Sequence, residues 1–387
     1  MKKGSALSNR SNQTEAPAKA PERPRRILHI GKYFPPHRGG METVLRDQMN
    51  MQSRDEGLQV AAVVHSSERR VTDRVEVQPL GYRVRHAARW FTAIFAPIAP
   101  LFAWSVYREI CELDPDEIKI HMPNLSAFWL LFLPAARKRR WVVLWHSDVL
   151  PSKHNLGLWM FYRFYKPFET WLLKRADVVI ATSPPYLETS EPLKPYRKKC
   201  LVKPLILDKL RLPAPTLISE KASDKEKRAL RILCVGRLTY YKNIKVLVDA
   251  VCRLKNTELR IIGDGPEGFT LRSQVTKNNV QDRIIFLGEV DEGELWKQFA
   301  WCDFNVLPSA ERTEAFGITI LEAAHFNKAT LHAAVPGSGL SYVSESTGFP
   351  GKTFTPGCVG SLCNAIIASA TEIQNVYVLH DHKKIKK

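Results

Sequence analysis

The sequence predicts an α/β protein with two doubly wound parallel-sheet domains that face each other across a cleft. Three observations lead to this fold class. The chain has 387 residues, more than one ordinary core holds at roughly 100–200 residues per domain. Short apolar runs alternate with longer helical patterns, as parallel βαβ units require. A segment without a steady hydrophobic period interrupts this alternation near the middle of the chain.

Composition and pattern divide the chain into four parts. Residues 1–25 are polar and basic and have no apolar period, which is typical of a disordered arm. The interruption contains Pro213, Pro215 and the charged run Lys221–Arg228, so it is interpreted as a linker. The expected parts are the arm (1–25), an N-terminal α/β domain (26–208), the linker (209–228) and a C-terminal α/β domain (229–387).

Candidate strands lie on both sides of the linker. Those before it are Ile27–Ile30, Val60–His65, Ile118–His121, Trp141–Trp145 and Val178–Ala181. Those after it are Arg231–Val235, Leu259–Ile262, Ile284–Leu287, Phe304–Leu307 and Thr330–Ala333. Helical patterns such as Glu42–Met51 and Leu158–Arg175 lie between them. Doubly wound sheets bind ligands beyond the carboxyl ends of their strands, so the residues that follow these strands form the candidate site.

The composition excludes several classes of protein. Hydrophobic residues make up 44% and charged residues 25%, which is an ordinary globular balance. The seven cysteines are odd in number and include no CxxC pair, which argues against a disulfide framework or a zinc ribbon. No run reaches the roughly 18 apolar residues of a membrane span, and the N-terminus has no apolar signal core. We therefore expect a cytoplasmic protein.

The positive charge is concentrated in the front half. The net charge is +18, and residues 1–205 carry +14 of it. Such an excess indicates an anionic partner there, either nucleic acid, acidic lipid or phosphate.

The loop after the first strand contains Gly39 and Gly40, just before a helix that starts near Met41. Two glycines let the backbone approach an anion closely, and a helix N-terminus favours negative charge. The loop has neither the GxGxxG pattern of dinucleotide-binding proteins nor the Lys-Ser/Thr of an ATP-binding loop. Taken alone, a phosphate loop and a plain turn explain it equally well.

Two loops follow strands of the second half. The first contains Gly236, Arg237 and Lys242. Its two cations could bind a diphosphate and neutralise the negative charge that develops on it as it leaves. That task otherwise needs a metal ion. A solvated surface pair is the alternative. The second contains Gly263 and Gly265, which either border a nucleotide base or simply form a βα turn. The turn is the better interpretation of that second loop.

The sharpest signal is a pair of glutamates eight residues apart, Glu314 and Glu322, with Phe316 and Gly317 between them. If the residues from Gly317 onwards are helical, eight residues return to within roughly 80° of the same face. Both carboxylates would then face one elongated ligand, and a carboxylate suits the vicinal hydroxyls of ribose or a sugar. An exposed acidic pair is the alternative, but Glu322 lies in the apolar run Ile318–Ala324.

Together these motifs resemble the retaining, metal-independent glycosyltransferases of family 4, whose GT-B fold has two Rossmann-like domains. The matching elements are the Gly39-Gly40 loop, His146 after Trp141–Trp145, Arg237 with Lys242, the turn Gly263–Glu267 and the Glu-x7-Glu pair. The resemblance covers roughly residues 26–350. Trp145–Asp148 and Glu311–Gly317 are most similar to bacterial mannosyltransferases that build surface polysaccharides, lipopolysaccharide among them, on a polyprenyl lipid.

The resemblance implies a role for each residue. The N-terminal domain would bind the acceptor and the C-terminal domain the nucleotide sugar, GDP-mannose. Arg237 and Lys242 would hold the diphosphate, Glu314 the donor sugar and Glu322 the ribose, while His146 would lie against the sugar near the reacting carbon. The implied catalytic residues are His146, Arg237, Lys242 and Glu314. The implied donor-binding residues are Gly39, Gly40, Gly236, Gly263, Gly265, Phe316, Gly317 and Glu322. Neither a metal nor a cofactor is implied.

Two further expectations concern the membrane and the end of the chain. The stretch Trp159–Arg175 interleaves aromatic and basic residues, as interfacial helices do, although a core helix with snorkelling ends explains it about as well. We expect peripheral contact with anionic lipid on the inner face of the cytoplasmic membrane. The family has further helices after the pattern Ser361–Ala370, so the C-terminal domain is expected to be shortened at its end.

Two alternative functions remain open at the level of the sequence. An inactive family remnant would bind a nucleotide sugar without turnover, and the shortened end of the chain is the reason to consider it. A basic nucleic-acid-binding protein would explain the charge, but the sequence contains no RNA- or DNA-binding motif.

Overall fold

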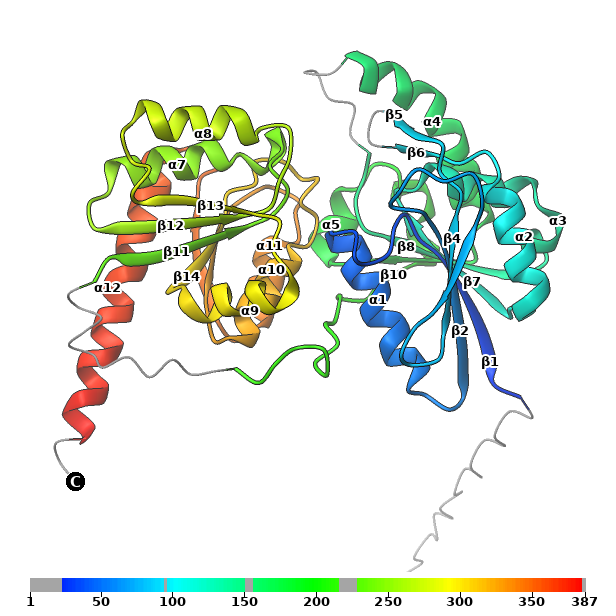
Figure 1. Cartoon of the computed structure of the whole chain (residues 1–387), viewed down its shortest axis with the longest axis horizontal. Coiled ribbons are helices and arrows are strands. Elements are labelled where there is room, and N and C mark those ends of the chain that lie inside the picture. Colours follow the sequence, from blue (N-terminus) through cyan, green and yellow to red (C-terminus); the bar gives the residue numbers. More distant parts are fainter. Residues whose placement is uncertain (1–22, 94–95, 150–155, 216–227, 385–387) are drawn as a thin grey trace, which may run out of the picture.

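The computed structural model describes residues 23–93, 96–149, 156–215 and 228–384, which form two large sheets with helices around them (Figure 1). The first sheet has eight strands in the order β10-β9-β8-β7-β1-β2-β4-β3. The second has six strands in the order β13-β12-β11-β14-β15-β16. Every neighbouring pair in both sheets is parallel except β3 with β4. The predicted fold class, two parallel-sheet α/β units, is therefore confirmed.

The first sheet is built from the front half of the chain. Its strands are β1 (Arg25–Ile30), β2 (Leu58–His65), β3 (Arg74–Val77), β4 (Arg83–Ala87), β7 (Glu117–Met122), β8 (Arg140–Trp145), β9 (Val178–Ala181) and β10 (Cys200–Val202). A separate antiparallel pair consists of β5 (Phe91–Ala93) and β6 (Ala96–Ile98). The helices are α1 (Gly40–Ser53), α2 (Phe102–Leu113), η1 (Leu125–Phe132), α3 (Pro134–Arg137), α4 (Leu156–Arg175), α5 (Pro184–Thr189) and η2 (Lys194–Lys199).

The second sheet is built from the back half. Its strands are β11 (Leu230–Val235), β12 (Thr257–Ile262), β13 (Ile284–Gly288), β14 (Phe304–Leu307), β15 (Thr330–Ala333) and β16 (Pro350–Phe354). Its helices are η3 (Tyr240–Lys242), α7 (Ile244–Arg253), α8 (Gly268–Lys277), α9 (Glu292–Trp301), α10 (Ile318–His325), α11 (Leu340–Ser346) and α12 (Val359–Lys384).

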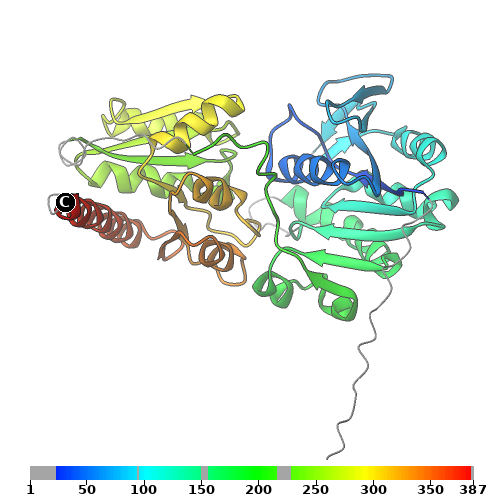
Figure 2. The ribbon, with the colours of Figure 1, turned by 90° about the horizontal axis from the view of Figure 1, so that it is seen from below.

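Both sheets are covered on their two faces, as parallel sheets usually are (Figure 2). In β11, Ile232 and Cys234 belong to the core formed with α7, α8 and α12, while Leu233 between them belongs to the core formed with α9 and α10. Figure 1 shows α7 and α8 on the opposite side of this sheet from α9 and α10. Burial on both sides explains why the strands appear in the sequence as continuous apolar runs.

All ten predicted strands are present, each within two residues of its expected bounds. The strands that were missed are short or polar. In β4, Arg85 is fully buried because its guanidinium bonds to Glu109 at 2.9 Å and Glu112 at 2.7 Å, both on α2. A buried arginine hides the strand from a search for apolar runs.

The described residues cover the predicted arm, domains and linker only in part. Residues 1–22 of the predicted arm and 216–227 of the predicted linker lie outside them, and Arg25 already belongs to β1. The first sheet ends at Val202 and the second begins at Leu230. We therefore keep 26–208 and 229–387 as proposed domains. The last helix, α12, extends to Lys384, well beyond the expected pattern Ser361–Ala370.

Candidate active site

Two helix N-termini from opposite halves of the chain lie close together. The helices are α1 and α10, and a Cβ added to Gly40 would lie only 3.7 Å from Cγ2 of Ile318. Their N-cap residues, Gly39 and Gly317, provide no side-chain hydrogen bond to the first turn. Exposed N–H groups and the positive end of the helix dipole favour an anion at such a place. The predicted Gly39-Gly40 loop and the loop before α10 are thus brought together.

Charged side chains from both halves surround this point. Arg237, after β11, is close enough to influence the titration of Lys32, His37 and Glu42. Burial lowers the pKa of Lys32, and the repulsion from Arg237 opposes the attraction to Glu42. Burial raises the pKa of Glu42, against the pull of its own backbone N–H, Lys32 and Arg237. Lys32 was missed from the sequence, although its place directly after Gly31 in the first strand-end loop was a usable signal.

Lys242 and Glu314 form an ion pair, and Glu314 also accepts a hydrogen bond from Ser309 Oγ at 3.2 Å. The two side chains are only 12% and 13% exposed. Burial alone would lower the pKa of Lys242, but Glu314 and Tyr241 outweigh it and the pKa is raised. The Glu314 carboxylate thus holds the Lys242 side chain in place.

The glycines of the second-half loops allow close packing between loops. A Cβ on Gly263 would lie 2.2 Å from the carbonyl oxygen of Gly236, and one on Gly265 would lie 2.4 Å from that of Leu238. At Gly236, a Cβ would lie 3.3 Å from Nζ of Lys242. These contacts explain Gly263 and Gly265 as packing residues of a βα turn, the interpretation that the sequence favoured. Their contact with a donor stays a prediction.

Phe316 and Gly317 have structural roles at the start of α10. Phe316 is buried with Leu307, Ile320 and Leu340. Gly317 has a φ of 68°, and a Cβ there would lie 2.6 Å from Leu340 Cδ2. The residues therefore shape the loop that carries Glu314, and their predicted donor contacts are untested.

Glu322 lies on α10 and is 6% exposed. Burial raises its pKa to about 7, with Arg211 lowering it and Asp47 and Glu292 raising it further. Glu314 precedes α10 and is paired with Lys242. The structure thus gives the two carboxylates separate surroundings, and no described residue bonds to both. Helix α10 begins at Ile318, so Glu314 lies just before its entrance, as expected, and the prediction that both carboxylates face one elongated ligand stays untested.

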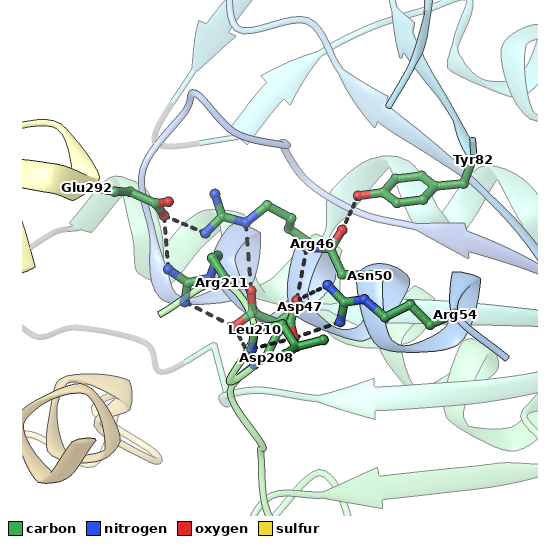
Figure 3. Close-up of polar contacts among 9 residues, drawn as sticks. All are labelled: Arg46, Asp47, Asn50, Arg54, Tyr82, Asp208, Leu210, Arg211 and Glu292. Carbon is green, nitrogen blue, oxygen red and sulfur yellow. Dashed lines mark hydrogen bonds and ion pairs between the residues drawn. The ribbon is translucent and has the colours of Figure 1, made fainter. Parts of the chain in front are cut away.

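A network of charges joins α1, the segment after β10 and α9 (Figure 3). Arg211 bonds to Asp47 through Nε at 2.8 Å and Nη2 at 3.0 Å, and its Nη1 bonds to Glu292 at 3.0 Å. Arg46 bonds to the same Glu292 oxygen at 2.5 Å. Asp208 accepts two bonds from Arg54, at 2.8 and 3.0 Å. We call these six residues, Arg46, Asp47, Arg54, Asp208, Arg211 and Glu292, the hinge network.

A second connection between the halves involves the loop that carries Glu314. Arg312 forms an ion pair with Asp148 and donates to Thr189 Oγ1 at 3.1 Å. Its guanidinium lies 4.5 Å from the ring centroid of Tyr186, and Thr189 donates to the carbonyl of Gly337 at 3.0 Å. We call Asp148, Tyr186, Thr189, Arg312 and Gly337 the loop contact. No sequence signal pointed to either connection.

His146 follows β8, two residues before Asp148, and is 8% exposed. Burial lowers its pKa to about 4, so the imidazole is neutral near pH 7. Across the described residues, no group of three or more His, Cys, Asp or Glu side chains is arranged to hold a metal ion. In the same residues, no helix is both long and apolar enough to cross a membrane.

Comparison with known proteins identifies the family. Residues 38–199 match the family described as Glycosyltransferase Family 4, and residues 217–356 match Glycosyl transferases group 1. The chain is 31% identical to the D-rhamnosyltransferase WbpZ of Pseudomonas aeruginosa over 82% of its own length and 80% of the relative. It belongs to glycosyltransferase family 4. The O-antigen chain mannosyltransferase C of Escherichia coli is 29% identical to this glycosyltransferase, over 83% and 82% of the two chains.

Solved structures show the same fold. The sucrose-phosphate synthase of Thermosynechococcus elongatus aligns with a TM-score of 0.67 and 18% identity, covering 94% of this chain and 98% of that one. Anabaena HepE in complex with UDP and glucose aligns with a TM-score of 0.62 and 18% identity, covering 91% and 94%. The protein is thus a retaining glycosyltransferase with the GT-B fold, related to enzymes of surface-polysaccharide synthesis.

Proposed function

We propose that this glycosyltransferase transfers mannose from GDP-mannose to a hydroxyl of a growing, polyprenyl-linked surface polysaccharide. The observation that carries the proposal is the meeting of the N-termini of α1 and α10, with Arg237 and Lys32 close by. This arrangement suits the diphosphate of a nucleotide sugar, which carries the largest negative charge of the donor.

The chemistry asks for charge stabilisation rather than for a protein nucleophile. The bond between the sugar and the phosphate breaks through an oxocarbenium-like state, and negative charge grows on the departing diphosphate. Arg237 and Lys242 would balance that charge, with Lys242 positioned by Glu314 and Ser309. His146 would contact the donor sugar and Glu322 the ribose hydroxyls. The protein also orients the acceptor hydroxyl against the sugar.

The preference for mannose rests on relatives. Their printed names include an O-antigen chain mannosyltransferase of Escherichia coli and a lipopolysaccharide core mannosyltransferase of Rhizobium leguminosarum. The same names support a polysaccharide acceptor.

A donor panel tests the proposal. We expect GDP-mannose to raise the melting temperature and to support transfer, whereas UDP-glucose and ADP-glucose do neither. Stabilisation by a different nucleotide sugar would overturn the donor assignment. Donor binding without turnover on any lipid-linked acceptor would favour the inactive remnant instead.

Glu322→Ala tests the ribose contact. The lost hydrogen bonds should weaken binding of the donor by about 2–4 kcal/mol, measured by calorimetry. Glu345→Ala, an exposed glutamate on α11, is the matched control and should bind normally. Unchanged affinity in a folded Glu322→Ala protein would remove this residue from the site.

Metal dependence is tested with EDTA. Transfer should continue after chelation because Arg237 and Lys242 provide the positive charge. A strict requirement for added Mg²⁺ or Mn²⁺ would contradict this mechanism.

We also propose that the front half docks on anionic lipid at the inner face of the cytoplasmic membrane. Exposed aromatic side chains gather on η1 and α4, and we call Trp129, Phe132, Phe164, Phe168 and Trp171 the aromatic face. The ring of Phe132 lies 5.4 Å from that of Trp171 and 6.3 Å from that of Phe168. Exposed basic residues flank it, namely Arg137, Lys138, Arg163, Lys166 and Lys174. Aromatic rings beside cations are suited to a lipid headgroup region.

Sedimentation with vesicles tests this docking. Each basic residue near an anionic surface contributes roughly 1 kcal/mol, so binding should require anionic lipid and weaken as salt rises. Phe132→Ser with Trp171→Ser should reduce binding, while Val71→Ser, an exposed apolar residue outside the aromatic face, should not. Equal binding to neutral and anionic vesicles would contradict the proposal.

A further inference from the structure

Three buried histidines form a continuous hydrogen-bonded chain across the neighbouring strands β1 and β7 to the residue that follows β8. His146 Nε2 lies 3.0 Å from His121 Nδ1, and His121 Nε2 lies 3.0 Å from His29 Nδ1. The far end is closed by Gln52 on α1, whose Oε1 lies 2.9 Å from His29 Nε2. The three imidazoles are 0%, 1% and 8% exposed for His29, His121 and His146. The chain therefore leads from helix α1, through β1 and β7, to a proposed active-site residue.

Each imidazole in this chain is neutral near pH 7. Burial lowers the pKa of His29 to about 3 and that of His146 to about 4. Burial, followed by His146, His29 and Lys119, lowers the pKa of His121 well below its ordinary value. A neutral imidazole has one N–H donor and one acceptor nitrogen. His29 and His121 each have a partner on both ring nitrogens, so each must donate on one side and accept on the other.

Gln52 sets the direction of the chain. Its Oε1 can only accept, so His29 carries its hydrogen on Nε2 and accepts through Nδ1. His121 then donates through Nε2 and accepts through Nδ1. His146 in turn donates through Nε2. Its Nδ1 is left without a hydrogen, and no described residue bonds to that atom.

The position of His146 connects this nitrogen to the reaction. His146 is two residues from Asp148, which pairs with Arg312 from the loop that carries Glu314. Burying three imidazoles in strands that are otherwise largely apolar has a desolvation cost, which is offset only when every ring finds a partner in order. A chain with a defined direction fixes a single tautomer at its open end.

We propose that Gln52, His29 and His121 are positioning residues that hold His146 in the tautomer protonated on Nε2, so that Nδ1 accepts a hydrogen bond from a hydroxyl of the donor sugar. The inference rests on the proposed function for the identity of the hydroxyl. The tautomer itself is a property of the protein without any ligand.

The first test reads the tautomer directly. The full-length protein labelled with ¹⁵N-histidine is studied by long-range ¹H–¹⁵N correlation spectra, with His146 assigned from the spectrum of His146→Asn. We expect His146 to carry its hydrogen on Nε2 between pH 6 and pH 8. A hydrogen on Nδ1 in the wild-type protein would overturn the proposal, whatever the enzyme's substrate is.

The second test changes the end of the chain. Gln52→Met removes the acceptor, so both tautomers of His146 should become populated, whereas Gln52→Glu keeps an acceptor and should preserve the wild-type tautomer. Gln48→Met, the same change on the same helix, is the control because Gln48 does not bond to the histidines.

Ligand affinities of the Gln52 variants distinguish a positioning role of the histidine chain from a purely structural one. Gln52→Met should weaken binding of GDP-mannose about tenfold and leave binding of GDP, which has no sugar, unchanged. Gln52→Glu should bind GDP-mannose as tightly as the wild-type protein does. An altered tautomer with unaltered GDP-mannose affinity, or an equal loss for GDP and GDP-mannose, would overturn the positioning role. If wild-type protein binds neither ligand, the proposed donor fails while the tautomer result still stands.

Discussion

The two connections between the halves of this glycosyltransferase differ in what they hold. In the hinge network, the segment after β10 is clamped onto α1 through Asp47 and Asp208, and Glu292 alone comes from the second sheet's helices. In the loop contact, Arg312 comes from the loop that carries Glu314 and reaches the front half directly through Asp148 and Thr189. Both use arginine and carboxylate, yet they anchor different parts of the chain.

The difference indicates that the hinge network serves mainly stability and the loop contact mainly activity. Asp47 is fully buried and the Arg211 side chain is 8% exposed, so the ion pair at the centre of the hinge network is desolvated. Removing Asp47 would leave the Arg211 charge buried without its main partner. Asp148 keeps hydrogen bonds from Trp145 Nε1 and Ser190 Oγ, both at 2.7 Å, even without Arg312. Breaking the hinge network should therefore lower the stability of the fold, and breaking the loop contact should change the placement of Glu314.

The largest effect is expected from Asp47→Ala. It leaves Arg211 without its bidentate partner in a buried place, and we expect a loss of about 3–5 kcal/mol in unfolding free energy. Chemical denaturation followed by tryptophan fluorescence measures this. Glu292→Ala is the control within the same network, because its side chain is 45% exposed and its loss should cost under about 1 kcal/mol. Equal losses for both variants would contradict the distinction.

The next effect concerns Glu322, which faces Arg211, Asp47, Glu292 and Arg46 of the hinge network. Its pKa is raised from 4.5 to about 7, so the folded protein retains a proton that the unfolded chain loses in this range. Stability contributed by this group therefore falls as pH rises from about 4.5 to 7. Glu322→Gln cannot ionise and should be more stable than the wild type at pH 8, by about 3 kcal/mol.

At pH 4.5, Glu322→Gln and the wild-type protein should unfold at nearly the same denaturant concentration. A constant difference across the pH range would show that the carboxyl group does not titrate as its surroundings indicate.

The smallest effect is expected from Arg312→Lys. A lysine cannot reach both Asp148 and Thr189 with a planar fork, so the Glu314 loop should be less well placed. We expect kcat for sugar transfer to fall about tenfold. The unfolding free energy should change much less than in Asp47→Ala, because lysine keeps a positive charge beside Asp148 and Asp148 keeps its bonds from Trp145 and Ser190. Steady-state kinetics and denaturation on the same preparation measure both. A loss of stability without a loss of kcat would reverse the roles assigned to the two connections.

The sequence was informative where local patterns carry the information. Buried parallel strands are continuous apolar runs, and this is why all ten expected strands were found. The glutamate in the apolar run of α10 was an equally local signal, and Glu322 is indeed buried. The general rule for ligands at the carboxyl ends of strands selected the loops after β1 and β11, and their role in binding stays a prediction.

The connections between the halves could not be predicted in this way. Asp47 and Arg211 are 164 residues apart, as are Asp148 and Arg312. The residues next to each of these side chains in the sequence do not indicate which distant residue it pairs with. The histidine chain is similar, since His29 and His121 are 92 residues apart and show no spacing typical of a ligand set. Strand order, set by the whole fold, brings them together.

The tight packing of Gly263 and Gly265 limits how the enzyme can be engineered. A side chain at either position would collide with the backbone of the neighbouring loop, at 2.2 Å and 2.4 Å respectively. Mutant libraries that vary this turn should therefore leave both glycines untouched. Variation is better directed at Asp264 and Pro266, which stand between and after them with exposed side chains. The same turn thus contains two positions that have no room for a side chain and two whose side chains are exposed, one of which, Asp264, accepts a hydrogen bond from the backbone N–H of Gly265 at 2.7 Å.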